Sequence, residues 1–258
     1  DMTAAQKEGY PTFMLKEINE QPAAINRTIM PRIKDGLPSF EEDGIPDSFF
    51  ADCSDITIVA CGTAMYAGMV GKTLMQDILG IPVTVAIASE FRYERPVITD
   101  KSVVIVVSQS GETIDTLEAL RLAKTKTNKT LSIVNVKGSS IARESNYVLY
   151  TPAGPEIAVA STKAYTVQAA AFYLLTCKLA LVQNAMSEAD ARAFISNLEN
   201  VSDNIAEVLK LSDKVEQLTK RMLNASHTFF IGRGSDYTLS MEGALKLKEI
   251  SYIHAEAY

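Results

Sequence analysis

Five consecutive β-branched residues, Val103 to Val107, place the strongest constraint on how this chain can fold. A run of this composition is typical of a strand that is buried on both faces, as in a parallel sheet. A helical pattern begins soon afterwards, at Ile114, with the predicted helix running from Thr116 to Lys126. The chain therefore contains at least one strand-turn-helix unit, with a polar turn between the two elements.

The same kind of unit recurs along the chain. Further strands are predicted at residues 56–60, 83–87, 130–134 and 148–150, and further helices at 65–79 and 164–182. Strands that alternate with helices at this spacing form parallel sheets with helices on both faces. We expect an α/β fold: a three-layer αβα sandwich with a parallel, doubly wound sheet of about five strands.

The flanking segments suggest four regions. Residues 1–50 form a helical segment, in which Pro22 begins a second helical piece, followed by a linker or loop from Gly36 to Phe50; residues 51–186 form the first subdomain. A helical connector, with a break near residue 211, covers 187–224, and a strand at 228–231 opens a second subdomain of the same type over 225–258. Because Asp1 precedes Met2 and the chain stops at Tyr258 without a cap, we expect a piece of a longer protein.

Composition excludes several classes of function. The formal net charge of −6 and the pI near 5.1 argue against nucleic acid or an anionic membrane surface as a partner. No apolar run approaches about 20 residues and no signal peptide opens the chain, so we expect a cytoplasmic protein. Three cysteines and two histidines form neither a disulfide framework nor a metal-ligand pattern, and we expect no metal and no cofactor.

The turn after the strand at Val103–Val107 is rich in neutral donors. Ser108, Gln109, Ser110 and Thr113 supply them, Gly111 allows a ligand to approach the backbone, and the following helix adds free N–H groups. The ordinary alternative is that Ser110 or Thr113 merely caps the helix. The turn lacks the Walker and dinucleotide glycine patterns, so a nucleotide is disfavoured. The pattern indicates a phosphate site without a lysine.

Two other helix starts carry similar side chains. Cys61-Gly62-Thr63 follows the predicted strand at 56–60, and Ser161 and Thr162 precede the helix at 164–182. Ligands of open α/β sheets bind at the carboxyl ends of the strands. We therefore expect the turns after the strands at 56–60 and 103–107 to face one crevice. Hydroxyl side chains gather at three helix starts, which is more than helix capping alone requires.

The last predicted helix, Met241 to about Ile253, carries a charged group of side chains. Glu242, Lys246 and Glu249 are spaced i, i+4 and i+7, so all three lie on one face. A solvated face with weak ion pairs is the ordinary interpretation. The alternative makes Glu249 a general acid/base and Lys246 a charge stabiliser, since moving a proton between adjacent carbons needs a carboxylate. For His254 a structural role is favoured over a role in a site.

With these residues in hand, the chain closely resembles the isomerase part of the glutamine:fructose-6-phosphate aminotransferase (glucosamine-6-phosphate synthase) family, which is built from two sugar isomerase (SIS) domains. Five segments carry the resemblance and together span most of the chain. Ser-Gln-Ser-Gly-Glu-Thr marks the broad SIS superfamily, whereas the terminal segment is specific to the synthases. The segments are residues 60–63, 88–93, 108–113, 156–164 and 242–258.

The resemblance implies a role for each candidate residue. The phosphate would be held by Ser108, Gln109, Ser110 and Thr113, and the sugar would be contacted by Thr63, Val159 and Ser161. Glu249 would shuttle the proton between C1 and C2 as the ketose imine becomes the amino aldose, with assistance from Lys246. Ala64 departs from the family pattern, which commonly has a serine there that touches the phosphate.

The resemblance also implies a reaction and partners. The family converts fructose-6-phosphate and glutamine-derived ammonia to glucosamine-6-phosphate, with a glutaminase domain in the same parent chain and, as we expect, a homodimer. A histidine and a lysine that family members use lie beyond the position of Tyr258, so this chain should bind better than it turns over. Two alternatives remain: a phosphosugar-sensing SIS module of a regulator, and a free-standing phosphosugar isomerase or deaminase.

Overall fold

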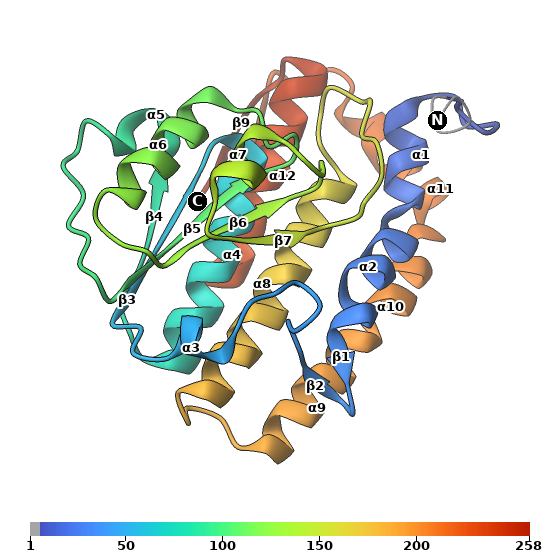
Figure 1. Ribbon diagram of the computed structural model, residues 1–258. Helices are drawn as coiled ribbons and strands as arrows, with labels where there is room; N and C mark the ends of the chain where they lie inside the picture. Colours follow the sequence, from blue (N-terminus) through green and yellow to red (C-terminus); the bar gives the residue numbers. More distant parts are fainter. Residues whose placement is uncertain (1–5) are drawn as a thin grey trace.

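A five-stranded parallel sheet forms the centre of the molecule in the computed structural model, which describes residues 6–258 (Figure 1). The prediction drawn from Asp1 and Met2 lies outside the described residues. The strands are, in spatial order, β4 (Val83–Ile87), β3 (Asp55–Ala60), β5 (Ser102–Ser108), β6 (Thr130–Val134) and β7 (Tyr147–Tyr150). Each neighbouring pair is parallel, which confirms the predicted sheet.

Alternate residues of β5 enter two different hydrophobic cores. Val103, Ile105 and Val107 belong to the core shared with α4 (Gly62–Leu79) and α8 (Lys163–Val182). Val104 and Val106 belong to the core on the other face, with α5 (Ala88–Phe91), α6 (Ile114–Lys124) and α7 (Ser140–Glu144). Side chains alternate between the faces of a strand, so a β-branched run fills both cores. The predicted three-layer sandwich is confirmed.

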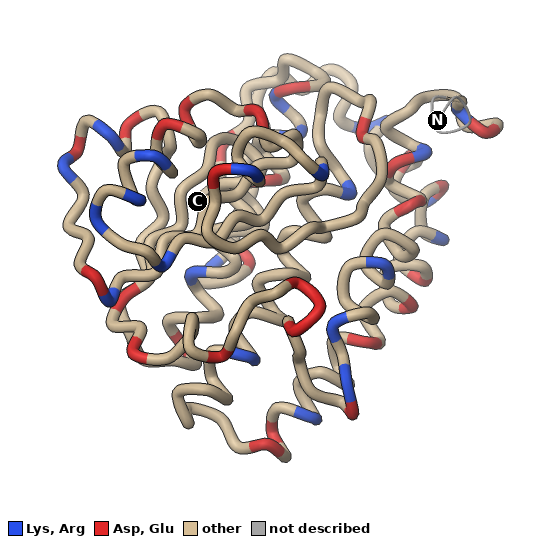
Figure 2. The backbone as a smooth tube through the Cα atoms, in the orientation of Figure 1, with Lys and Arg blue, Asp and Glu red and all other residues tan. Residues whose placement is uncertain are grey.

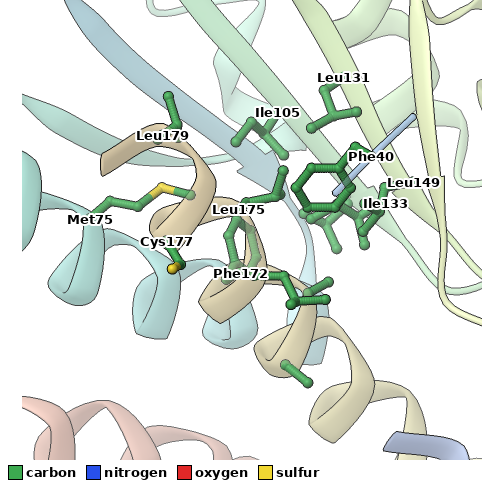
Figure 3. Packing of buried hydrophobic residues seen from close by; sticks show 14 of the residues in the cluster. Phe40, Met75, Ile105, Leu131, Ile133, Leu149, Phe172, Leu175, Cys177 and Leu179 are labelled. Carbon is green, nitrogen blue, oxygen red and sulfur yellow. The ribbon is translucent and has the colours of Figure 1, made fainter. Parts of the chain in front are cut away.

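Helix α8 is the most deeply buried helix of the larger core. Its Phe172, Leu175 and Leu179 lie in one buried cluster with Ile105 and Leu131 of the sheet (Figure 3). By length and composition α8 is the only helix in the described part of the chain that could span a membrane, so the expectation that no apolar run approaches that length is wrong. Burial explains its composition, because a helix covered by a sheet and by other helices is apolar on most of its circumference.

Charged residues are nearly absent from the central sheet. Its five strands contain one, Asp55, at the first position of β3, while charges are spread over the helices and loops around them (Figure 2). A charge at the middle of such a strand would be buried without water on either face, at a cost of several kcal/mol or more.

The N-terminal region is more structured than predicted. Helices α1 (Phe13–Asn19) and α2 (Gln21–Ile29) divide where expected, beside Pro22, and η1 (Met30–Arg32) follows. The interpretation of Gly36 to Phe50 as a loop is partly wrong, because it contains β2 (Leu37–Pro38), paired antiparallel with β1 (Ile33–Lys34), and α3 (Asp47–Phe50). The segment is ordered by burial: Phe40, Ile45, Phe49 and Phe50 all belong to the larger core.

The connector consists of α9 (Glu188–Glu199), α10 (Val201–Leu209), α11 (Ser212–Thr219) and η2 (Lys220–Met222). The break near residue 211 is confirmed, whereas the one at Asn200 was not predicted. Beyond it, β8 (His227–Phe230), α12 (Ser235–Ser251) and β9 (His254–Ala257) form a separate unit in which the two strands pair in parallel. Helix α12 starts earlier than expected and ends at Ser251, and the following residue, Tyr252, has a φ of +58°.

Candidate functional site

A small pocket opens where β3 and β5 end. Strand β3 has β4 on one side and β5 on the other, so the connections after β3 and β5 leave the sheet in opposite directions, and such a switch point is where open α/β sheets bind ligands. The pocket measures about 240 Å³, below the 300–1,000 Å³ range of drug-sized sites, and so suits a small ligand. It is lined by Cys61, Thr63, Ala64, Val107, Ser108, Gln109, Ser110, Thr113, Thr116, Ser161 and Gln168.

Hydrogen bonds of its own hydroxyl groups stabilise the turn after β5. Ser108 Oγ accepts a hydrogen bond from the Gly111 N–H at 3.0 Å and lies 3.0 Å from Thr113 Oγ1. Ser110 Oγ accepts from the Glu112 N–H at 3.2 Å. Thr113 occupies the N-cap position of α6, yet its side chain makes no cap hydrogen bond. Capping alone therefore does not explain these hydroxyls, and the first N–H groups of α6 remain available to an anion.

Contacts with α7 fix this turn in position. Gly111 has a φ of +68°, and a Cβ at this residue would collide with the Ser139 side chain, so only glycine fits. Gly111 O accepts from the Ile141 N–H at 3.0 Å, and Glu112 Oε1 accepts from the Ser140 N–H at 2.8 Å. Hydrogen bonding from Ser140, first from its side chain and then from its backbone N–H, lowers the pKa of Glu112. The turn is therefore anchored by residues at the start of α7.

Helix α4 brings Thr63 to the pocket. Its N-cap residue, Cys61, makes no side-chain cap bond, so a second helix N-terminus lies uncapped at the pocket. Thr63 Oγ1 accepts a hydrogen bond from Lys246 Nζ at 2.8 Å and donates to Glu242 Oε1 at 3.1 Å. Thr63 therefore connects the pocket to the charged face of α12, which is 179 or more residues away in the chain.

The charged face of α12 is packed against α4 rather than solvated. Lys246 Nζ lies 2.5 Å from Glu249 Oε2 and 3.5 Å from Glu242 Oε1. The side chains of Lys246, Glu242 and Glu249 are 16%, 8% and 35% exposed, so the ordinary interpretation as a surface ion-pair face does not hold for the first two. Burial raises the pKa of Glu242 to about 7, and the nearby Lys246 partly opposes this shift.

Glu242 is the member of this group for which sequence reasoning found no role. Its spacing to Lys246 is visible in the sequence, but its burial depends on the distant α4. Glu249, by contrast, does not line the pocket itself and reaches it through Lys246 and Thr63. The structure thus brings the two predicted catalytic residues together beside the pocket.

The segment before α8 places one of the two residues predicted to contact the sugar at the pocket and leaves the side chain of the other outside it. Ser161 lines the pocket and donates to Glu156 Oε2 at 2.8 Å, while Glu156 Oε1 accepts from the Thr162 and Ala164 N–H groups. The carboxylate of Glu156 therefore caps α8 in place of the Thr162 hydroxyl, which makes no cap bond. The Val159 side chain is 99% exposed and is not among the pocket residues.

A buried carboxylate on α1 holds this segment in place. Glu17 is almost fully buried and accepts hydrogen bonds from the Ile157 N–H at 2.5 Å and the Ala158 N–H at 3.2 Å. Nearby, Lys163 Nζ at the start of α8 lies 2.5 Å from Glu20 Oε2. No local sequence pattern reveals a contact between residues 140 positions apart, so sequence reasoning missed Glu17.

The described residues contain no group arranged to hold a metal ion, and they form larger cavities elsewhere. In residues 6–258, no group of three or more His, Cys, Asp or Glu side chains is arranged to hold a metal ion. A larger cavity of about 640 Å³ lies between α2 and β7, where the Arg32 guanidinium is paired with Asp43 at 2.6 Å. A third, of about 450 Å³, is mainly apolar and contains Tyr173 and Phe194.

Comparisons with known proteins identify the family to which the chain belongs. The SIS domain family matches residues 49–178. Along its whole length the chain is 48% identical to the glutamine–fructose-6-phosphate aminotransferase [isomerizing] of Caldanaerobacter subterraneus subsp. tengcongensis and 46% identical to that of Clostridium perfringens. The chain spans 43% and 42% of the length of these two relatives.

Among solved structures, the C-terminal domain of glucosamine-fructose-6-phosphate aminotransferase from Francisella tularensis is similar over 98% of this chain and 71% of its own. The TM-score is 0.94 and the sequence identity is 42%. The match extends beyond the central sheet to the connector and to the β8–α12–β9 unit, since it covers nearly every residue. The chain belongs to the SIS domain family and, within it, to the isomerase part of the glutamine–fructose-6-phosphate aminotransferases.

Proposed function

We propose that the pocket binds fructose-6-phosphate and its amino sugar product, with the phosphate at the turn from Ser108 to Thr113. The observation that carries the proposal is the pair of helix N-termini, those of α4 and α6, which meet one pocket without side-chain caps. Their N–H groups and the hydroxyls of Ser108, Ser110 and Thr113, together with the Gln109 amide, are donors suited to phosphate oxygens. Thr63 and Ser161 face the same space from two other segments and are assigned to the sugar.

Val159 is assigned to the sugar through its backbone, because its side chain points away from the protein. A backbone carbonyl or N–H can contact a ligand whatever the side chain does. Ala64 lines the pocket without a polar group, so the phosphate is held by the remaining donors.

The chemistry proposed for α12 is a proton transfer. Fructose-6-phosphate and ammonia form the imine with loss of water. The Glu249 carboxylate then takes a proton from C1 as the imine nitrogen gains one, and returns its proton to C2 as the C1 hydroxyl loses its own, which yields the amino aldose. Lys246 holds that carboxylate at 2.5 Å and is itself held by Thr63 at the pocket. A positioned carboxylate of this kind contributes typically 10²–10⁴-fold to a proton transfer.

The full-length protein is proposed to be a cytoplasmic glucosamine-6-phosphate synthase. The support is the identity of 46–48% to the aminotransferases named above, of which this chain spans less than half. Glutamine-derived ammonia would come from a glutaminase domain of the same chain, and residues 225–258 would begin a second SIS domain. A homodimer would complete the site. A sensing module accounts for the pocket but not for the pair formed beside it by the buried Glu242 and the partly buried Lys246.

The direct test is glucosamine-6-phosphate formation by the full-length protein from fructose-6-phosphate and glutamine. We expect product only when both substrates are present. Calorimetry with fructose-6-phosphate is run in parallel. Binding without product formation would identify a sensing module, whereas conversion between sugar phosphates without glutamine would identify a free-standing isomerase or deaminase.

A further inference from the structure

Two polar side chains in the pocket belong to none of the turns discussed above. Gln168 lies in the second turn of α8 and Thr116 in the first turn of α6, and both line the pocket with Ser108 and Ser161. Gln168 is 2% exposed and Thr116 is fully buried. Gln168 Oε1 and Thr116 Oγ1 have no hydrogen-bond partner anywhere in residues 6–258.

Unpaired polar atoms of this kind are uncommon inside proteins. More than about nine in ten buried polar groups are hydrogen-bonded, since an unpaired one forfeits its bonds to water without compensation. Gln168 also has small and apolar neighbours on α8, such as Ala164, Ala171 and Phe172, none of which offers its amide a side-chain hydrogen bond. Its amide is therefore explained by a partner that enters through the pocket.

The chemistry of the two groups identifies that partner. The turn from Ser108 to Thr113 and the start of α6 offer mainly N–H and O–H donors, which match phosphate oxygens. Gln168 Oε1 is an acceptor, and an ionised phosphate has no hydrogen to give it. A sugar hydroxyl both donates and accepts, so it can pair with the amide of Gln168 and with the Thr116 hydroxyl.

We propose that Gln168, assisted by Thr116, recognises a hydroxyl group of the phosphosugar and so selects the sugar rather than the phosphate. The inference rests on the proposed function, because it takes the ligand to be a phosphosugar. A site built to pair with a substrate hydroxyl rejects an analogue that lacks it, since its own buried groups then remain unpaired. Gln168 and Thr116 are accordingly specificity residues.

The test replaces the amide by an apolar chain of similar length, Gln168→Met, in the full-length protein. Calorimetry then measures the affinities for fructose-6-phosphate and for inorganic phosphate. We expect at least about tenfold weaker binding of fructose-6-phosphate and unchanged binding of inorganic phosphate. The melting temperature of the ligand-free variant should be unchanged or higher, because the substitution removes an unpaired buried group.

Gln183→Met is the matched control. Gln183 follows the last residue of α8, about 22 Å along the helix axis from Gln168, and its amide is engaged with the Phe50 carbonyl at 3.2 Å. The control should leave the affinity for fructose-6-phosphate unchanged. A second variant, Thr116→Val, should weaken fructose-6-phosphate binding in the same direction as Gln168→Met.

Deoxy analogues of fructose-6-phosphate, lacking the hydroxyl at C3 or at C4, complete the test. One of them should bind more weakly than fructose-6-phosphate to the unsubstituted protein, and the difference should disappear in Gln168→Met. Equal affinity of both proteins for fructose-6-phosphate would overturn the inference, and so would an equal loss for inorganic phosphate. Failure of the unsubstituted protein to bind fructose-6-phosphate would instead contradict the proposed function, and the inference with it.

Discussion

Lys246 Nζ on α12 donates a 2.8 Å hydrogen bond to Thr63 Oγ1 on α4. The bond joins a lysine of the β8–α12–β9 unit to a hydroxyl of the pocket beside the main sheet. The same lysine holds Glu249 at 2.5 Å. Two parts of the chain are thereby combined, one that would bind the sugar phosphate and one that would move its proton.

The first prediction concerns the proton transfer. Glu249→Gln in the full-length protein keeps the shape of the side chain but removes the base, so amino sugar formation should fall by at least about 10²-fold. Fructose-6-phosphate affinity should change by less than about threefold, because glutamine keeps the size of the side chain and only the proton transfer needs its charge. Steady-state kinetics and calorimetry provide both numbers.

Glu216→Gln is the control for that variant. Glu216 makes a similar ion pair, with Lys220 at 3.0 Å, on the exposed surface of α11. Its replacement should alter neither turnover nor affinity. Retention of full turnover by Glu249→Gln would remove Glu249 from the mechanism.

Ser110→Ala should weaken phosphosugar binding. Ser110 lines the pocket, and the one hydrogen bond of its hydroxyl within residues 6–258 is accepted from the Glu112 N–H, so its proton is available to a phosphate oxygen. Loss of one bond to a charged oxygen corresponds to about 1–3 kcal/mol, or roughly 5–150-fold in affinity. Ser54→Ala, at the opposite end of β3, should have no effect. Equal affinities in calorimetry would exclude Ser110 from the phosphate site.

The raised pKa of Glu242 should appear in the pH dependence of stability. Its ordinary pKa is 4.5 and its pKa in the folded protein is about 7, so folding favours the protonated form. The protein should therefore lose stability as the pH rises from 4.5 to above 7, by about 3 kcal/mol for this group alone. In Glu242→Gln that part of the pH dependence should vanish. Urea denaturation between pH 5 and pH 8 measures how the free energy of unfolding changes with pH. The same pH dependence in the unsubstituted protein and in Glu242→Gln would refute the raised pKa of Glu242.

Glu17→Gln should loosen the segment before α8. The variant keeps one acceptor oxygen but loses the charge that receives the Ile157 and Ala158 N–H groups, at an expected cost of about 1–3 kcal/mol. Amide hydrogen exchange at residues 157 and 158 should accelerate, and KM for fructose-6-phosphate should rise more than kcat falls. Glu207→Gln, on the exposed side of α10, is the control. Unchanged exchange at these two amides would show that Glu17 does not hold the segment.

Gly111→Ala should disrupt the turn that follows β5. The new methyl group would collide with Ser139, and alanine disfavours a φ of +68°. We expect a loss of more than about 1 kcal/mol in stability together with weaker phosphosugar binding. Ser139→Gly in the same protein should recover part of the stability by removing the collision. No recovery in the double variant would mean that backbone strain alone accounts for the loss.

The sheet was predictable because each of its strands carries its own evidence. A β-branched run such as Val103–Val107 predicts a strand that is buried on both faces of a sheet. The polar turn after the run indicates the end of the sheet at which a ligand is expected. The bounds of helix α8 were predicted within one residue, because its apolar composition is likewise visible in its own sequence. Gly36 to Phe50 was not predictable, because its helix and strand form only when Phe40 and Phe50 pack into the larger core.

The candidate site divides in a similar way. The hydroxyls from Ser108 to Thr113 are adjacent in sequence, so their shared position could be predicted. The roles of Glu17 and Gln168 could not be predicted. Glu17 contacts a segment 140 residues away, and Gln168 stands out only because its buried side-chain oxygen has no hydrogen-bond partner in the described residues. The separation of Val159 from the pocket also depends on the path of the segment between β7 and α8, which no local pattern determines.

The central claim is that hydroxyl and N–H groups at the ends of β3 and β5 receive a phosphate group. A crystal structure of the protein with fructose-6-phosphate bound tests it most directly. The account predicts the phosphate at the N-terminus of α6, within hydrogen-bond distance of Ser108, Ser110 and Thr113. A fully occupied complex with the phosphate elsewhere, for example in the cavity between α2 and β7, would contradict it.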